Sequence, residues 1–206
     1  INSEKFIKYK IFLICIRPCD DVEYEFEFLK NKNVQIITLK NGNFFVKLKS
    51  LRSIINYILP DIIHSHGFYP DVFLSFTSGG FKKLTTIHNI IYQDYSSRYG
   101  LKGYLFSLIH YIFLKYGKID KIIGCSYDVE KSLKKIIKSQ NIYHVYNGVN
   151  INEFDCIDSE NKRKIRKVNL NLDCDVLIAF CGGVERVKKV PELVDLYINK
   201  LEGFNF

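Results

Sequence analysis

Short runs of β-branched and other apolar residues recur along the chain and are separated by longer polar or amphipathic stretches. Several runs are apolar at every position, as strands buried on both faces of a parallel sheet must be. Strands that alternate with helical stretches are typical of a doubly wound α/β domain, so we predict a parallel sheet flanked by helices. The runs span residues 10–16, 34–39, 61–64, 84–88, 121–125, 142–146 and 176–181.

Three of the intervening stretches carry apolar residues at the 3.6-residue spacing of an amphipathic helix. The second can begin at Ser126 or Asp128 as its N-cap, and the third has Pro191 in its first turn. Residues 22–28 instead alternate glutamate with apolar residues, like a half-exposed strand. Because a doubly wound fold requires a helix there, we expect one. The three stripes are Leu101, Leu105, Leu108, Ile109, Ile112, Phe113 and Tyr116; Val129, Leu133, Ile136 and Ile137; and Val190, Leu193, Val194, Tyr197 and Leu201.

The composition is that of a globular protein and excludes a disordered chain, a collagen and a coiled coil, because 47% of the 206 residues are hydrophobic and 25% are charged. The net charge of +8 is mostly lysine, which suits diffuse attraction to phosphate or to anionic lipid. No run of about 18 uncharged apolar residues predicts a transmembrane helix. The six cysteines form no CxxC pair, so we expect reduced thiols and a cytoplasmic protein.

The character of the chain changes near residue 150. We expect one domain over residues 1–150, a polar linker over 151–175, and the first strand and helix of a second α/β domain over 176–206. One strand and one helix cannot bury both faces of a sheet. We therefore expect the chain to be the front part of a longer protein.

Polar residues follow two of the predicted strands at the point where each strand ends. His66 and Gly67 follow the run at 61–64, and His88 ends the run at 84–88. Because ligands bind beyond the carboxyl ends of strands in open α/β sheets, both histidines are candidates for one cleft. The alternative is that they serve as helix-capping or turn residues. His64, two residues earlier, is more typical of a hydrogen-bonded core histidine.

Three further motifs allow a structural or a functional interpretation. Ser126 follows the run at 121–125, where it serves either as the N-cap of the next helix or as a hydroxyl that binds a ligand. Asn147-Gly148 matches a type I′ turn. Gly182 and Gly183 lie between a strand and a helix, where glycines let a phosphate approach backbone N–H groups and Lys188 adds charge. This last motif is neither GxGxxG nor a P-loop.

The segment 101–140 contains eight lysines and three acidic residues around an aromatic-rich helical stretch. It could lie on an anionic membrane surface, or it could be a core helix with a solvated lysine face. No nucleic-acid-binding motif accompanies the charge, so we expect no nucleic-acid partner.

Taken in order, these motifs resemble Glycosyltransferase Family 4, the retaining nucleotide-sugar enzymes of the GT-B fold. The similarity extends from about residue 60 to residue 196. Residues 60–67 resemble the family's PDIIHSH strand, 86–88 its T-x-H strand end, and 120–126 its D-x-I-I-x-x-S segment. Residues 145–150 with Phe154 resemble the NGVD…F hinge, and 176–188 resemble the first strand and GRL…EKG loop of the second domain.

The resemblance implies two Rossmann-like domains with a nucleotide diphosphate sugar between them, and no cofactor or divalent metal. The acceptor would be a polysaccharide or a lipid-linked glycan of the cell surface, met at the inner face of the membrane. By position, His88 would approach the donor sugar, and the substrate would contact His66, Gly67, Ser126 and Asn147. The donor diphosphate would contact Gly182, Gly183, Arg186 and Lys188.

The sequence also departs from the family pattern. Gly183 stands where the family has an arginine, for which Arg186 is a substitute, and Lys189 stands where it has a glycine. The family's paired glutamates belong beyond Phe206, so we expect these 206 residues alone to be inactive. The alternative function is a non-catalytic module that binds an acceptor or a membrane.

Overall fold

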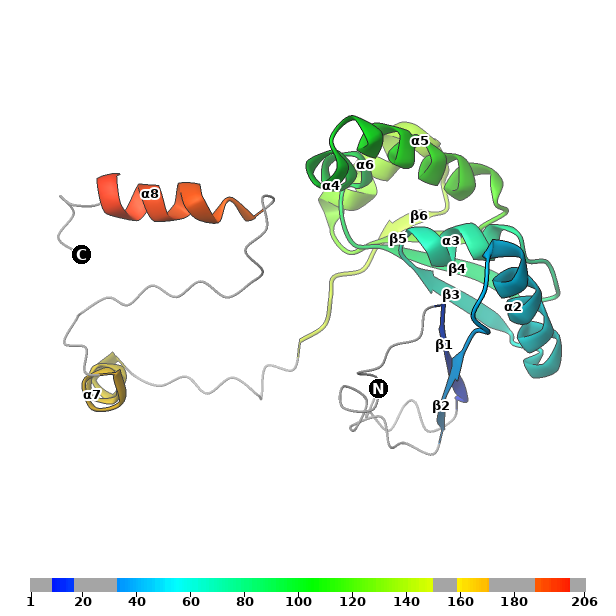
Figure 1. The fold of residues 1–206 in the computed structure, drawn as a ribbon, viewed down its shortest axis with the longest axis horizontal. Coiled ribbons are helices and arrows are strands. Elements are labelled where there is room, and N and C mark those ends of the chain that lie inside the picture. The colour runs from blue at the N-terminus through cyan, green and yellow to red at the C-terminus, as the bar shows by residue number, and fades with distance from the viewer. Residues whose placement is uncertain (1–8, 17–32, 150–158, 171–187, 201–206) are drawn as a thin grey trace. The chain divides into compact units, whose positions relative to one another are not determined.

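The computed structural model describes residues 9–16, 33–149, 159–170 and 188–200 (Figure 1). The helix predicted at 22–28 and the strand predicted at 176–181 lie outside these residues. The chain forms two compact units, one of residues 1–90 and 106–145 and the other of residues 91–105 and 146–206. Each unit is described separately below.

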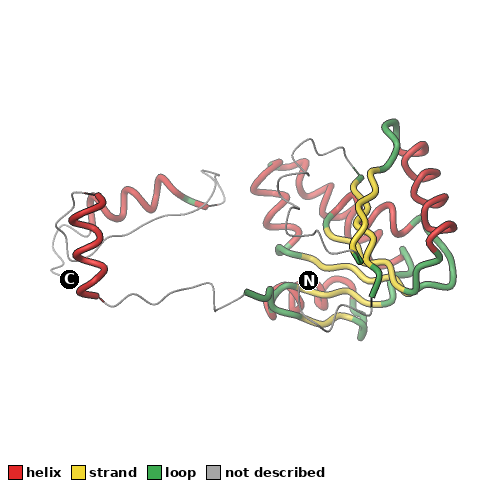
Figure 2. The backbone as a smooth tube through the Cα atoms, turned by 90° about the horizontal axis from the view of Figure 1, so that it is seen from below, coloured by secondary structure: helices red, strands yellow, loops and turns green. Residues whose placement is uncertain are grey.

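In the described part of the first unit, the chain forms six parallel strands. They are β1 (Ile11–Cys15), β2 (Val34–Thr38), β3 (Ile62–His66), β4 (Lys82–Ile87), β5 (Lys121–Gly124) and β6 (Ile142–His144). The prediction of parallel strands alternating with helices is therefore confirmed, with strand ends shifted by one to two residues. Among the described residues the strands form two sheets, because β1 pairs with β2 alone and the others form a sheet in the order β3-β4-β5-β6. The two sheets cross in Figure 2.

Helices connect consecutive strands of the larger sheet. The connections include α3 (Phe68–Ser75) between β3 and β4 and α6 (Tyr127–Ile137) between β5 and β6, while α2 (Phe44–Ile58) joins the two sheets. Two of these helices have side-chain N-caps, Asn43 on α2 and Ser126 on α6. Each cap satisfies a backbone N–H that has no partner within its helix. The predicted N-cap at Ser126 is thus confirmed.

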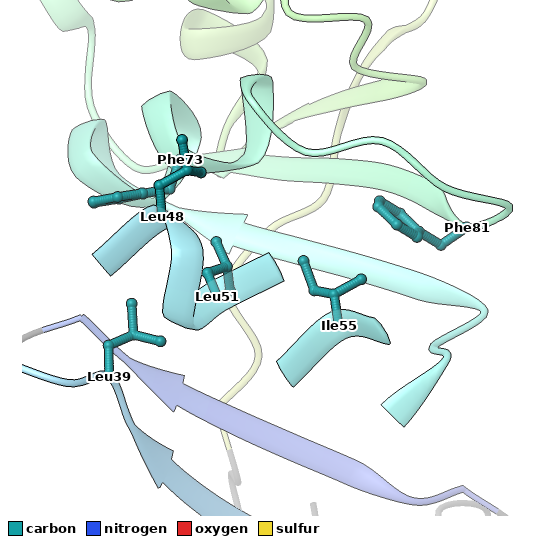
Figure 3. Packing of buried hydrophobic residues seen from close by; sticks show 6 residues of the cluster. All are labelled: Leu39, Leu48, Leu51, Ile55, Phe73 and Phe81. Atoms are coloured by element: carbon teal, nitrogen blue, oxygen red, sulfur yellow. The ribbon is translucent and has the colours of Figure 1, made fainter. Parts of the chain in front are cut away.

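The main hydrophobic cluster lies where α2 packs against both sheets and α3. Leu48, Leu51 and Ile55 point from α2 toward Leu39, which follows β2, and toward Phe73 of α3 (Figure 3). Phe81, at the start of β4, completes the cluster. The Phe44 and Phe73 rings stack with their centroids 4.8 Å apart. This packing joins the two-stranded sheet to the four-stranded sheet within one unit.

The expectation that the apolar runs are buried on both faces is only partly correct. β4, an interior strand, buries Lys83, Thr85 and Ile87 on one face. β3 buries only Ser65 and exposes Ile62, because within the described residues it is the edge strand of its sheet. The Lys83 ammonium donates to the backbone oxygen of Thr77 at 2.5 Å, which gives its buried charge an acceptor.

The helix α5 (Leu101–Tyr116) has the predicted bounds, but its apolar stripe does not face the core. Leu108, Ile112 and Tyr116 are 57%, 46% and 68% exposed, whereas Ser107, His110 and Leu114 are buried. The interpretation of α5 as a core helix with a solvated lysine face is therefore only partly correct: Tyr111 and Leu114 are buried and Lys102 and Lys115 are exposed, but the aliphatic stripe is exposed as well. The end of α5 lies very close to α3, because a Cβ on Gly117, the residue after the helix, would stand 2.2 Å from Ser75 Oγ.

The second unit contains α4 (Ile91–Tyr99), the first turns of α5, α7 (Ser159–Leu170) and α8 (Val190–Lys200). Gly100 adopts a φ of 58° between α4 and α5, in the left-handed region that favours glycine. The helix α7 lies inside the predicted linker and carries a Lys164–Glu160 pair at 2.9 Å across one turn. Pro191 lies in the first turn of α8, as predicted.

None of the helices in the described ranges combines the length and the apolar character that crossing a bilayer requires.

Candidate functional site

Two histidines meet at the carboxyl edge of the four-stranded sheet. His66 ends β3, and His88 follows β4 by one residue. Parallel pairing places His66 opposite Thr86, so the next side chain of β4 on that face belongs to His88. His66 Nδ1 lies 3.0 Å from His88 Nε2, and the ring centroids are 5.3 Å apart. The prediction that both histidines face one site is supported by this contact.

A third imidazole continues the row along β3. His64 and His66 share one strand face, and their ring centroids are 4.4 Å apart. His64 Nε2 hydrogen-bonds Thr86 Oγ1 at 2.7 Å. The prediction of a hydrogen-bonded histidine is confirmed, but the core location is wrong, because this face of the edge strand is exposed. The row therefore runs along an accessible face of the sheet to its carboxyl edge.

Gly67 makes the turn from β3 into α3. Its φ is +90°, a conformation that side chains rarely adopt, although no atom lies within 4 Å of a Cβ built there. The backbone conformation, not a steric contact, thus requires glycine. Open space above Gly67 leaves the edge beside His66 accessible to a ligand. Gly67 is the N-cap residue of α3, whose first N–H groups lie at the same sheet edge.

Two histidines of the row, His64 and His66, have a lowered pKa. Burial lowers the pKa of His64 and that of His66. A neighbouring imidazole lowers each pKa further: His66 lowers that of His64, and His88 lowers that of His66. The 3.0 Å contact of His66 with His88 requires one nitrogen to donate and the other to accept. A neutral imidazole has one donor and one acceptor nitrogen, so it can donate to a hydroxyl group or accept from one.

A buried carboxylate lies beneath the row. Asp71 of α3 has no exposed surface, and its Oδ1 accepts from Ser65 Oγ and Thr85 Oγ1, each at 2.5 Å. Its Oδ2 lies 2.8 Å from Nε2 of His110 on α5. Ser65 is the residue between His64 and His66, so this network fixes β3, β4, α3 and α5 around the site. Asp71 was not identified from the sequence. The one indication of a buried carboxylate was a single acidic residue within the apolar stretch of residues 68–75.

The end of β5 adds a thiol and a hydroxyl to the same sheet edge. Cys125 Sγ donates to the His88 carbonyl oxygen at 3.0 Å, and Cys125 N donates to the Ile87 carbonyl oxygen at 3.0 Å. These contacts hold the backbone that carries the His88 ring. Ser126 Oγ accepts from Val129 N at 3.4 Å as the N-cap of α6. Its substrate contact stays a prediction.

A depression of about 350 Å³ lies on α6, lined by Tyr127, Glu130, Lys131, Lys134 and Lys135. Glu130 pairs with Lys134 at 2.5 Å and with His144, which ends β6. Lys134 and His144 hold the pKa of the Glu130 carboxyl below its usual range. This acidic group therefore neutralises part of the lysine charge. Sequence reasoning did not identify this cluster, because the contact of His144 with Glu130 depends on how β6 packs against α6.

The other predicted site residues belong to the second unit or lie outside the described residues. Asn147 belongs to the second unit, in an exposed irregular segment after β6. Neither Asn147 nor Gly148 has a positive φ, so the predicted type I′ turn is wrong. Lys188 is exposed just before α8, whereas Gly182, Gly183 and Arg186 lie outside the described residues. Within the described ranges, no group of three acidic, histidine or cysteine side chains is arranged to hold a metal ion.

The fold and this edge define a Rossmann-like α/β domain with an accessible histidine site at the carboxyl ends of its strands. The sequence matches the model of Glycosyltransferase Family 4 over residues 9–153, which is more than half of the chain. The chain belongs to Glycosyltransferase Family 4, and its described α/β domain is the amino-terminal domain of that family. None of the curated proteins matches the sequence. Family membership supports a glycosyltransferase activity with a sugar donor and an acceptor.

Proposed function

We propose that this chain carries the acceptor-side domain of a retaining glycosyltransferase. The enzyme would transfer a sugar from a nucleotide diphosphate sugar to a polysaccharide or lipid-linked acceptor, in the cytoplasm, for cell-surface glycan synthesis. The observation that carries the proposal is the contact of His66 with His88 at an accessible sheet edge in a domain of this family. His88 is the proposed catalytic residue, next to the donor sugar.

The histidine pair suits hydroxyl-rich ligands. An imidazole in its neutral form offers a hydrogen-bond donor and an acceptor without the desolvation cost of a full charge. Gly67 leaves space for a ring beside the pair, and the first turn of α3 presents backbone N–H groups at the same edge. We expect the acceptor to contact His66 and Gly67, with Ser126 and Asn147 nearby in the assembled site.

The donor part of the proposal concerns the second domain. Gly182, Gly183, Arg186 and Lys188 would bind the diphosphate through backbone N–H groups and positive charge. This stabilisation acts where negative charge develops as the sugar leaves, and it requires no divalent metal or cofactor. The support for this part is the sequence resemblance and the exposed Lys188 ahead of α8.

Imidazole NMR provides a direct test of the acceptor site, because the chain has only five histidines. We would titrate the protein with short oligosaccharides, UDP-glucose and GDP-mannose and follow the imidazole nitrogens. The His66 and His88 signals should shift together. The buried His110, which is bonded to Asp71, is the internal control and should stay in place.

Transfer is tested separately, with the enzyme that contains both domains, by measuring acceptor-dependent release of nucleoside diphosphate and reading the anomeric configuration of the product by NMR. We expect His88→Gln to reduce transfer by about a hundredfold or more, while His144→Gln has a much smaller effect. Absence of imidazole shifts, together with absence of transfer across a panel of donors, would contradict the proposal. Shifts without transfer would favour the non-catalytic binding module.

A further inference from the structure

The outer face of α5 is built from the residues that a helix ordinarily buries. Leu108 and Ile112 are 57% and 46% exposed, and Tyr116 continues their line. At 3.6 residues per turn, Leu101 and Leu105 extend the same line to the start of the helix. Ile109 is part of the same face, at its border. The result is an aliphatic stripe along a helix that is about 24 Å long at 1.5 Å per residue.

The helix cannot rotate to hide this stripe. His110 is fixed by its 2.8 Å contact with the Asp71 carboxylate, and Leu114 is 2% exposed on the same buried side. A Cβ on Gly117 would lie 2.2 Å from Ser75 Oγ, so the end of α5 has no room to turn. The side of α5 with His110, Tyr111 and Leu114 therefore faces the domain, and Leu108 and Ile112 face outward.

The charge around the stripe has one sign. From residue 95 to residue 119 the sequence contains no Asp or Glu, but it contains Lys102, Lys115 and Lys118 as exposed cations. Helical periodicity places Lys102 on one side of the stripe and Lys115 on the other. Tyr104 and Tyr116, both exposed, supply amphipathic rings near the two ends. An aliphatic stripe with lysine flanks and tyrosine ends is complementary to an anionic bilayer surface.

We propose that α5 is an in-plane membrane contact. Its Leu/Ile stripe (Leu101, Leu105, Leu108, Ile109 and Ile112) enters the headgroup boundary of an anionic bilayer, and the flanking lysines meet lipid phosphates. A second copy of this chain fits the face less well, because a self-complementary contact would bring like-charged lysines together. The contact lies outside the histidine site and goes beyond the transfer reaction. It places the domain at the surface where a lipid-linked acceptor resides.

The test is co-sedimentation of the purified 206-residue chain with vesicles of phosphatidylcholine alone and with about 30% phosphatidylglycerol. We expect binding to the anionic vesicles only, and a marked loss when salt is raised from about 0.1 M to about 0.5 M. The double variant Leu108→Gln/Ile112→Gln should bind at least about tenfold more weakly. Its matched control is Phe45→Gln/Tyr57→Gln on α2, which removes two exposed apolar side chains elsewhere and should bind like the parent chain.

A charge variant provides a second, independent arm. Lys102→Glu/Lys115→Glu should abolish binding to anionic vesicles, whereas Lys40→Glu/Lys49→Glu, with the same change in net charge, should reduce it by less than about threefold. Circular dichroism would establish that each variant is folded. Because vesicle binding needs no sugar donor, its outcome is separate from that of the transfer assay.

Three outcomes would overturn the proposal. The first is that the parent chain does not sediment with anionic vesicles. The second is that the α2 control loses binding as strongly as the α5 variant. The third is that light scattering shows a dimer that Leu108→Gln/Ile112→Gln converts to a monomer with vesicle binding unchanged, which would assign the stripe to a second copy.

Discussion

Asp71 is the residue on which the packing beneath the candidate site depends most. Its carboxylate is fully buried and accepts from Ser65, Thr85 and His110, which belong to three different elements. A buried acceptor with three donors is costly to alter, because each donor that loses its partner remains desolvated. The same carboxylate opposes the effects that lower the pKa of His64 and of His66.

We predict that Asp71→Asn lowers the free energy of unfolding by about 3 kcal/mol, since an amide cannot accept at both of its ends. Urea denaturation measures this loss. The matched control is Asp94→Asn on α4, whose partner Arg98 lies 3.0 Å away in an exposed helical pair. That change should cost less than about 0.5 kcal/mol. Equal effects of the two changes would show that the buried network does not contribute as described.

The histidine row predicts a pH dependence of stability. Burial and neighbouring imidazoles lower the pKa of His64 and of His66 from 6.5 in the folded state. The unfolded chain therefore binds more protons than the folded chain just below this pH. The free energy of unfolding should fall as the pH falls from about 7.5 to about 5.5.

The variant His66→Gln isolates this effect. It removes one imidazole with a lowered pKa and relieves His64 of a like-charged neighbour on protonation, so its stability should fall less steeply with pH. Urea denaturation of both proteins at the two pH values provides the comparison. An identical pH dependence in the variant and the parent chain would contradict the described coupling of the row.

At the scale of elements, strand positions follow from the sequence more reliably than helix orientation does. A run such as 121–125 carries enough β-branched residues to specify a strand by itself. The orientation of α5 depends instead on what its neighbours can accept. Close approach to α3 requires Gly117 on the inside, and Ser107 is buried on the same side, although hydrophobicity alone selects Leu108 and Ile112.

A pair of equivalent substitutions on α5 tests this orientation. Leu114→Ala should lower the free energy of unfolding by about 2–5 kcal/mol, because the side chain is 2% exposed and its loss leaves a cavity. Leu108→Ala, six residues earlier on the exposed stripe, should cost less than about 0.5 kcal/mol. Urea denaturation compares them directly, and a greater loss for Leu108→Ala would mean that the stripe faces the core.

At the scale of the whole molecule, the core lies in one part of the sequence. Within the described residues, all the buried hydrophobic side chains lie between Leu39 and Ile142. The strands of the four-stranded sheet end at His144. This distribution agrees with the family match over residues 9–153 and with the change in composition near residue 150.

We predict that a chain ending after Val149 retains the fold and unfolds in urea with a free energy within about 1 kcal/mol of the 206-residue chain. A chain ending after Ile137 loses β6 and with it Ile142, which has no exposed surface. It should therefore be strongly destabilised or unfolded. If both truncations unfold the protein equally, then residues after 149 support the first unit.

The candidate site was predictable in part. His66 and His88 could be placed together because parallel strands end at a common edge, which is a rule of topology. Asp71 and the Glu130–His144 pair could not, because their partners are brought together only by packing between α3 and α5 and between α6 and β6. The location of His64 on an exposed face was also missed, since an edge strand cannot be identified from its own residues.

The sequence by itself determined the alternation of strands and helices, the N-cap at Ser126 and the histidines at the strand ends, because these depend on local pattern and chain order. Tertiary structure alone decided that the described strands form two sheets, that Asp71 is buried with three donors, and that Leu108 and Ile112 of α5 face outward. The physical reason is that a surface is buried only when a second surface packs against it. A helix buries the side that fits its neighbour most closely, and that neighbour is set by the whole fold.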